Sequence, residues 1–226
     1  MDINKNDFIE IEFTGRIKEG EIFDSNIKED LEKTKINPKA QEQQAKTFIF
    51  SIGQNMFLKG IDEFLIGKEF KPGIEYEIEI EPEKAFGIRN SNFIKIIPTK
   101  IFIEKQINPV PGAMFSFDGQ IAKIISVSGG RVITDFNNPL AGKVVVYKIK
   151  ILREVDNIDE KIKSLMDFFF RREFKHEIDA KNKKLIIEAE KGFKQFIEIF
   201  KNKFKEILDL ELEVAEIEEK NGKEEK

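Results

Sequence analysis

The sequence predicts an α+β protein in which a curved antiparallel sheet surrounds one helix, a small all-β domain is inserted into that sheet, and a C-terminal α+β domain follows. Three observations carry this prediction: several segments alternate apolar and polar residues, one good helix lies among the first hundred residues, and the pattern turns helical after Val155. The expected boundaries are 1–87 and 140–154 for the discontinuous first domain, 88–139 for the insert and 155–226 for the last.

The strands of the first domain are predicted by alternation. Residues 9–13, 74–81 and 145–151 place apolar side chains at every second position. Alternate residues of a strand share one face, so these strands have one wet face, which is typical of an antiparallel sheet. We therefore interpret the four glutamates of residues 75–81 as a solvated strand face rather than as an acid–base pair.

The one helix of the first domain is expected over residues 51–67, SIGQNMFLKGIDEFLIG. Phe57 and the apolar residues after it have the spacing of a helix that packs on one sheet. Met56 and Leu58 add apolar side chains to the same expected first turn, which such packing does not require. We interpret Met56 as filling a gap beside the sheet.

Two further segments of the first 140 residues have their own character. Residues 25–47 are polar and contain a proline, which predicts a surface excursion with one or two helical turns. Between residues 88 and 139, short apolar runs are broken by NPVPG, DGQ, SGG and NNP. That spacing of turns predicts the hairpins of a small all-β domain.

Composition excludes several kinds of function. The chain has 226 residues, a formal net charge of -4, no cysteine and one histidine, His176. Disulfides, thiol catalysis and thiolate metal sites are excluded, and a lone histidine, interpreted as a surface or hinge residue, predicts no metal site. Balanced charge predicts no nucleic-acid partner, and the lack of a long apolar run predicts no membrane segment and a cytoplasmic location.

Four segments in order resemble the signatures of the FKBP-type peptidyl-prolyl cis-trans isomerases. They are FTGRIKEGEIFDSN, FIFSIGQNMFLKGIDEFLIG, EPEKAFG and PLAGKVVVYKIKIL, and they span about residues 7 to 153. The position of the insert, between NSNFIKIIPTKIF and PLAG, is similar to the insert-in-flap domain of SlyD-like bacterial and archaeal members. Residues 155–226 resemble the extra domain of long archaeal members in size and position.

The resemblance implies a peptidyl-prolyl cis-trans isomerase with an apolar, noncovalent proline pocket, no cofactor and no metal. The start of the helix would form the floor and one wall of that pocket, and Leu58 would offer a backbone N–H to a substrate carbonyl. Asp24 would polarise or orient the substrate carbonyl. The implied pocket positions are Phe13, Phe23, Asp24, Phe48, Phe57, Leu58, Ile61, Ala85, Phe86 and Tyr147.

The sequence departs from the family at three of these positions. Phe13 and Phe86 stand where tyrosine is common, and Ile61 stands where tryptophan is common. Two hydroxyl hydrogen bonds, each worth about 1 kcal/mol, and the flat indole are therefore absent.

Three functions compete on this basis. The first is an isomerase that also serves as a folding chaperone for unfolded or nascent polypeptides with X–Pro bonds. The second is a chaperone with a weak or decayed isomerase pocket, and the third is a non-enzymatic binding scaffold. The retained Phe23, Asp24 and Tyr147 favour the first.

The insert contains a candidate surface for client binding. Its segment PVPGAMFSFDG places Met114, Phe115 and Phe117 near Gly and Pro turns. Flexible and aromatic side chains suit a tolerant surface for unfolded chains, although at least half of these must also form the core of the insert.

The C-terminal domain is expected to contain helices over residues 158–174 and 191–207, with strands in 177–190 and 210–219. Its segment LMDFFFRREF has three consecutive phenylalanines, which cover more than half of a helix circumference. A domain of this size has too little interior for all of them, so one is expected to meet a second chain or the insert. We favour the first alternative, a homodimer through the C-terminal domain.

Overall fold

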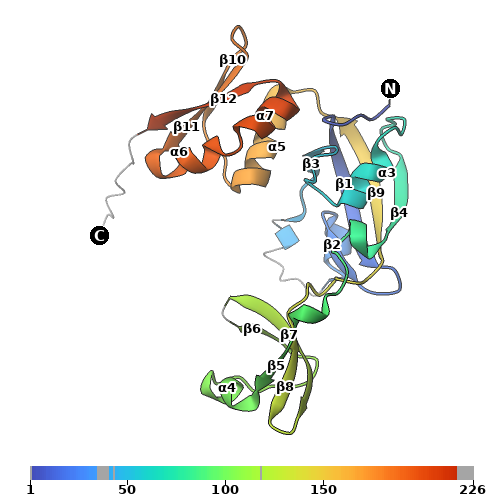
Figure 1. Cartoon of the computed structure of the whole chain (residues 1–226). Helices are drawn as coiled ribbons and strands as arrows, with labels where there is room; N and C mark the ends of the chain where they lie inside the picture. The colour runs from blue at the N-terminus through green and yellow to red at the C-terminus, as the bar shows by residue number, and fades with distance from the viewer. Residues whose placement is uncertain (1, 35–40, 43, 118, 218–226) are drawn as a thin grey trace. The chain divides into compact units, whose positions relative to one another are not determined.

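The computed structural model (Figure 1) describes residues 2–34, 41–42, 44–117 and 119–217. A five-stranded sheet has the order β2-β1-β9-β4, with β3 paired to β1. Its strands are β1 (Phe8–Ile17), β2 (Ile22–Ser25), β3 (Phe48–Ser51), β4 (Glu75–Ile80) and β9 (Val145–Glu154). The predicted alternation is confirmed in β4, where Ile78 and Ile80 are buried and the glutamates beside them are exposed.

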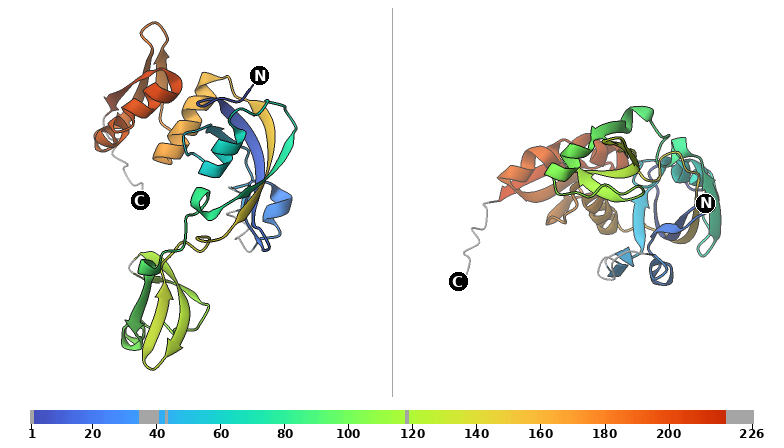
Figure 2. Two further views of the ribbon diagram at one scale, coloured as in Figure 1. Left: turned by 45° about the vertical axis from the view of Figure 1, so that its right-hand side comes forward. Right: turned by 90° about the horizontal axis from the view of Figure 1, so that it is seen from below.

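The first of two compact units contains residues 1–14, 24–78 and 148–226. Figures 1 and 2 show α3 (Lys59–Leu65) against one face of the sheet, where Ile61 and Leu65 are fully buried. A short helix, α1 (Lys28–Leu31), follows β2 in the expected surface excursion, of which residues 35–40 and 43 lie outside the described residues.

The helix α3 begins later than predicted. Met56 and Phe57 lie in a bend, and Leu58 is the N-cap with extended backbone, so the prediction that all three occupy the first helical turn is wrong. The physical reason lies just before them, because Gly53 and Asn55 have φ of 76° and 54°. A right-handed helix cannot pass through left-handed residues.

The second unit contains residues 15–23 and 79–147. Its antiparallel sheet has the order β5-β8-β7-β6. The elements of this unit are η1 (Pro82–Lys84), η2 (Ser91–Phe93), β5 (Ile94–Pro98), α4 (Thr99–Glu104), β6 (Met114–Phe117), β7 (Gln120–Ser128) and β8 (Arg131–Asp135).

The expectation of an all-β insert is wrong because of α4. Pro98 ends β5 and is the N-cap of this helix, and Phe102 on the helix packs with Ile124 and Val132 of the sheet to form a small buried core. The helix covers one face of the four-stranded sheet. The strand side chains that point to the opposite face are not covered by this helix.

The C-terminal part of the first unit mixes helices with a second small sheet. Its elements are α5 (Ile158–Phe170), β10 (His176–Asp179), β11 (Lys184–Glu190), α6 (Lys191–Glu198), α7 (Lys201–Leu208) and β12 (Glu211–Ile217). β10 is antiparallel to β11, whereas β12 is parallel to it. Residues 191–207, predicted as one helix, form two, with the break at Ile199 and Phe200.

The break between α6 and α7 changes the interpretation of the phenylalanine cluster. Phe200 lies 4.8 Å from the ring centroid of Phe169 and 5.5 Å from that of Phe170, and Phe204 lies 5.9 Å from Phe170. Phe170 is buried and Phe169 is half-buried. Phe169 and Phe170 therefore pack within this part of the chain, whereas Phe168 is half-buried, so the expectation that one of the three meets another surface stays a prediction.

His176 is not a surface or hinge residue. It begins β10, its side chain is only 9% exposed, and its Nε2 lies 2.8 Å from Oδ1 of Asp159 on α5. The pair ties the first turn of α5 to the edge of the small sheet. Across the described ranges, no helix has the length and apolar character that crossing a membrane requires.

Candidate functional site

The residues that the resemblance places in a proline pocket are divided between the two compact units. The first unit holds Phe13, Asp24, Phe48, Phe57, Leu58 and Ile61, and the second holds Phe23, Ala85, Phe86 and Tyr147. We call Phe13, Phe48, Phe50 and Phe57 the first-unit cluster. We call Phe23, Phe86 and Tyr147 the second-unit cluster.

The first-unit cluster gathers around Phe57, directly before α3. The ring centroid of Phe57 lies 4.8 Å from Phe13 on β1, 5.5 Å from Phe48 and 5.7 Å from Phe50 on β3. Most of these pairs meet at steep angles, the geometry in which the positive edge of one ring meets the negative face of another. Phe48 and Phe57 remain half-buried, so the cluster keeps apolar surface that a ligand could reach.

The residues beside Phe57 have different environments. Leu58 is half-buried, and its carbonyl accepts the first hydrogen bonds of α3, from the N–H groups of Ile61 and Asp62. Ile61 has no exposed surface, so in this conformation it supports the cluster from beneath. Met56 is 5% exposed, and its Sδ accepts a hydrogen bond of 3.3 Å from the N–H of Ser51, so it fills the core and also satisfies the end of β3.

Asn26, two residues after Asp24, forms a hydrogen-bond network that the sequence does not predict. Asp24 is half-buried in β2, and the buried Asn26 follows two residues later. The side chain of Asn26 accepts from the N–H of Phe13 at 2.7 Å and donates to the carbonyl of Ile11 at 3.0 Å. The side-chain amide of Asn26 thus fixes the backbone of β1 at Phe13 and the end of β2 after Asp24. The one sequence feature that points to this role is the triplet DSN, which is typical of a turn and follows an apolar run.

The loop before α3 is held by Asp62. One carboxylate oxygen accepts from the N–H of Asn55 at 3.1 Å, and the N–H of Gly53 also donates to this carboxylate. The other oxygen, Oδ1, is buried without a hydrogen-bond partner in the described part of the chain. Burial raises the pKa of Asp62, and the two backbone hydrogen bonds oppose that rise.

The second-unit cluster is centred on Phe23. Its ring centroid lies 5.6 Å from Phe86 and 5.9 Å from Tyr147 on β9, in both cases nearly perpendicular. A Cβ on Gly15 would lie 2.7 Å from Cζ of Tyr147, so only glycine on β1 leaves room for this ring. Tyr147 is 1% exposed, whereas Phe23 and Phe86 are half-buried.

The turn that carries Ala85 and Phe86 is fixed by backbone hydrogen bonds. η1 begins at Pro82, whose carbonyl accepts from the N–H of Ala85 at 3.1 Å and from that of Gly87 at 2.7 Å. Gly87 has a φ of 81°, which a residue with a Cβ adopts at a cost. The glycine therefore lets the chain reverse while Ala85 and Phe86 stay half-buried.

The candidate client-binding residues of the insert are separated by the strand they share. Phe115 and Phe117 are half-buried, and their rings lie 5.1 and 6.2 Å from the core residue Phe102. Met114 points to the opposite face and is 53% exposed. Of the three, only Met114 lies on an open surface, and the assignment of the other two to client binding stays a prediction that their packing does not favour.

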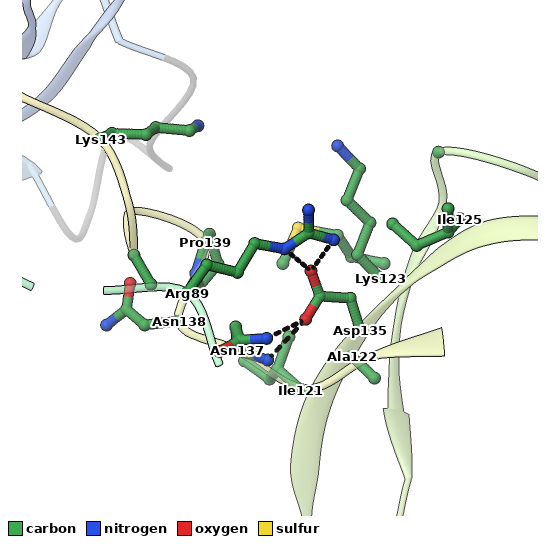
Figure 3. Close-up of a pocket in the computed structure, with 13 residues that line it drawn as sticks. Arg89, Ile121, Ala122, Lys123, Ile125, Asp135, Asn137, Asn138, Pro139 and Lys143 are labelled. Atoms are coloured by element: carbon green, nitrogen blue, oxygen red, sulfur yellow. Dashed lines mark hydrogen bonds and ion pairs between the residues drawn. The ribbon is translucent and has the colours of Figure 1, made fainter. Parts of the chain in front are cut away.

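Met114 lines a cavity of about 480 Å³ in the second unit (Figure 3). Ile121 and Ile125 of β7 line it too, together with the segment from Asn137 to Lys143 and with Arg89. Arg89 donates from Nε to Oδ2 of Asp135 at 2.9 Å. Sequence reasoning missed this cavity because its walls come from segments about fifty residues apart.

The chemistry available in these places is noncovalent. The clusters offer aromatic and aliphatic surface, a single carboxylate at Asp24 and backbone N–H groups. Within the described residues, no group of three or more acidic, histidine or cysteine side chains could hold a metal ion.

Two family models match the chain. The model described as FKBP-type peptidyl-prolyl cis-trans isomerase matches residues 1–104, and the model described as FKBP26, IF domain matches residues 95–140. Together the two models cover residues 1–140, which include the sheet of the insert and the strands that precede it.

The curated proteins to which the chain is similar are also named as peptidyl-prolyl cis-trans isomerases. A short-type peptidyl-prolyl cis-trans isomerase of Methanocaldococcus jannaschii is 32% identical over 149 residues, which are 66% of this chain and 92% of that protein. An FKBP-type 16 kDa peptidyl-prolyl cis-trans isomerase of Escherichia coli K12 is 30% identical over 49% of this chain and 75% of its own length. The SlyD protein of Helicobacter pylori, named as an FKBP-type peptidyl-prolyl cis-trans isomerase, is 32% identical over 47% of this chain and 59% of its own length.

The first of these relatives is matched over 92% of its length at 32% identity. On this ground, the chain belongs to the FKBP-type peptidyl-prolyl cis-trans isomerases and to their SlyD-like branch.

Proposed function

We propose that this protein isomerises X–Pro peptide bonds of unfolded polypeptides, with proline held by the aromatic residues that the family resemblance implies. Family membership supports the reaction. The observation that carries the choice of residues is Phe57, a half-buried ring packed on Phe13 and Phe48 directly before the N-cap of α3.

The reaction needs no nucleophile. Rotation about X–Pro is slow because amide resonance makes a barrier of about 18–20 kcal/mol, and this resonance is lost in the twisted transition state. The twisted amide is less charge-separated than the planar one, so an apolar pocket stabilises it relative to the ground state. Each difference of about 1.4 kcal/mol accelerates the reaction tenfold.

Named groups can be given roles in this scheme. The aromatic rings hold the proline, the N–H of Leu58 donates to a substrate carbonyl, and Asp24 orients the carbonyl before the proline. Asn26 positions Phe13 of the first-unit cluster through its hydrogen bonds to β1.

The test of the pocket is the rate of isomerisation of a short X–Pro peptide. Asp24→Ala should lower kcat/KM about tenfold, because one interaction with the carbonyl is lost. Glu29→Ala, an exposed change in α1, is the matched control and should leave the rate unchanged. Equal rates for Asp24→Ala and the parent, with both proteins folded by circular dichroism, would remove Asp24 from the mechanism.

The insert is proposed to capture unfolded clients on the face that α4 leaves open. Met114, Ile121 and Ile125 are 53%, 63% and 41% exposed there, so this face groups apolar side chains that a client could contact. Capture would raise the local concentration of X–Pro bonds at the pocket.

Deleting residues 88–139 separates capture from catalysis. The N–H of Gly142 donates to the carbonyl of Gly87 at 2.8 Å, so a short loop can close the gap without stretching the chain. Peptide isomerisation should be largely retained, whereas acceleration of proline-limited protein refolding should fall about tenfold or more. Equal losses in both assays would mean that the insert shapes the pocket.

The runner-up function is a chaperone with a weak pocket. The phenylalanines at positions 13 and 86 and the buried Ile61 lack the polar groups and the flat floor that the family commonly has. This alternative expects suppression of aggregation without acceleration of the peptide reaction. A fixed-partner scaffold expects neither.

A further inference from the structure

The cavity of the insert combines apolar walls with two lysines, Lys123 and Lys143, that form no ion pair among the described residues. Met114, Lys123 and Asp135 lie in one row across β6, β7 and β8, because Met114 is opposite Lys123 and Lys123 is opposite Asp135. Residues directly opposite each other share a face of the sheet, so the apolar and the cationic side chains look into the same space. Lys143 lines the same cavity.

The carboxylate in the cavity wall is already used. Asp135 is held by Arg89, whose NH2 nitrogen lies 2.7 Å from Oδ2, and by Asn137, whose N–H and side-chain amide donate to Oδ1 at 2.9 and 2.6 Å. Burial alone would raise the pKa of Asp135, but the hydrogen bonds from Asn137 and the Arg89 guanidinium lower it overall. Asp135 therefore stays ionised and neutralises Arg89, not the lysines.

The positive charges of Lys123 and Lys143 are not neutralised by any carboxylate of the described residues. In Figure 3 the dashed lines join Arg89 and Asn137 to Asp135, and none reaches the amine of Lys123 or Lys143. Among the residues that the structure describes, neither amine has a carboxylate within ion-pair distance. The charge of the whole segment agrees, because residues 88–139 contain six basic and three acidic residues, while the chain as a whole has a net charge of -4.

We propose that the insert selects acidic clients: extended segments in which an apolar residue, seated on Met114, Ile121 and Ile125, has Asp or Glu within two positions. In an extended chain, residues i and i+2 lie about 6.6–7 Å apart on one side. A lysine side chain beside the apolar site can span that distance, since its stem is long and flexible. The inference rests on the proposed capture function and adds to it the class of polypeptide captured.

The test uses three labelled eleven-residue peptides without proline, each with a central Leu-Phe-Leu flanked on both sides by Asp, by Asn or by Lys. Binding to the full chain is measured by fluorescence anisotropy at low salt. The Asp peptide should bind about three- to tenfold more tightly than the Asn peptide, because each exposed charge pair contributes a factor of about two to five. The Lys peptide should bind more weakly than both, and the spread should shrink at 0.5 M salt.

Matched variants separate the local charge from the global charge. Lys123→Glu should abolish or reverse the preference for Asp over Lys. Lys100→Glu makes the same change of net charge on α4, where Lys100 pairs with Glu104 outside the cavity, and should leave the order of the three peptides unchanged. A reversal of similar size in both variants would attribute the selection to the overall field and overturn the proposal.

The remaining outcomes are equally distinct. Equal affinity for all three peptides would overturn acidic selection and leave capture by the insert in place. Binding of none of them would overturn both. Displacement of the Asp peptide by an oligothymidylate as readily as by unlabelled Asp peptide would assign the lysines to phosphate, and acidic polypeptides would no longer be the partner.

Discussion

Asp62 holds the loop before α3 although it is almost fully withdrawn from water. Asp62 is 3% exposed, its carboxylate receives backbone hydrogen bonds from Asn55 and Gly53, and one carboxylate oxygen has no partner in the described chain. Because burial raises its pKa in the folded state, the folded protein loses stability as pH rises from the unfolded pKa of 3.8 through the folded one. Below pH 3.8 this cost is absent.

Asp62→Asn tests this balance, since asparagine keeps an acceptor for the loop without the charge. We expect the free energy of unfolding at pH 7 to rise by about 1 kcal/mol, with little change at pH 3.5. Urea unfolding at both pH values measures it, and Glu63→Gln, an exposed change on the same helix, is the control. A variant destabilised at pH 7 would show that the loop needs the charged form.

Met56 has one role that the sequence predicts and one that it does not. The sequence places it in an apolar run that reads as helix, and the interpretation of Met56 as a filler of the core is confirmed by its burial. The bond from Ser51 N–H to its sulfur depends on β3 and the loop meeting in space, and no local pattern reports such a meeting. The start of α3 was mispredicted for the same reason, because the left-handed Asn55 is held by the distant Asp62.

At the scale of elements, α7 is linked to the loop that precedes α3. Glu206 of α7 accepts from Lys5 at 2.8 Å and from Gln54 at 3.1 Å, and Lys203 donates to the side-chain carbonyl of Gln54 at 3.0 Å. The hydrogen bond from Lys5, then those from Gln54 and Lys203, lower the pKa of Glu206 to about 2. Gln54 itself is buried, so the C-terminal part of the chain holds the loop that ends at Phe57.

Glu206→Gln should therefore loosen the loop. We expect amide hydrogen exchange of residues 52–57 to accelerate about two- to fivefold at pH 7. The effect should fade as pH drops from 4.5 toward 2, because the stabilisation from a depressed carboxyl pKa is lost as that carboxyl is protonated. Glu211→Gln, which breaks only a pair with Lys205, should leave this exchange unchanged. Unaltered exchange in Glu206→Gln would mean that the loop is held without α7.

The elements that were predicted well have strong, uninterrupted periodicity. The alternating glutamates of β4 and the apolar positions of β1 and β9 specify strands on their own. The short helix α4 was missed because Ile101, Phe102 and Ile103 are equally compatible with a strand over six residues, and only the packing of Phe102 on Ile124 decides. The break between α6 and α7 has the same origin, since Phe200 leaves the helical path to reach Phe169.

For the whole molecule, we propose a homodimer through the C-terminal part, for a different reason from the one the sequence suggested. Phe170 of α5 is buried and Phe168 and Phe169 are half-buried, whereas Phe196 and Ile199 at the end of α6 are 42% and 73% exposed, and Phe193 is 36% exposed. Apolar side chains grouped on one helix favour a self-complementary contact.

Sedimentation of the full chain at tens of micromolar tests the dimer. Phe196→Glu should raise the dissociation constant about thirtyfold or more, since a buried aromatic anchor is replaced by a charge. Ile103→Glu, a change at a 66% exposed residue of α4, should not alter it. A parent protein that sediments as a monomer would end the proposal, and a Phe196→Glu variant that still dimerises would place the contact elsewhere.

The position of β9 has a consequence for the newborn chain. β9 lies between β1 and β4 in the sheet, yet it is synthesised after the whole insert. At about 5–20 residues per second, the ribosome needs several seconds to pass from the end of β4 to β9. During that interval the insert can close its own sheet while β1 and β4 still lack the strand that joins them. Each new copy would thus form the surface that we propose for capturing unfolded chains before the sheet of its own isomerase domain is complete.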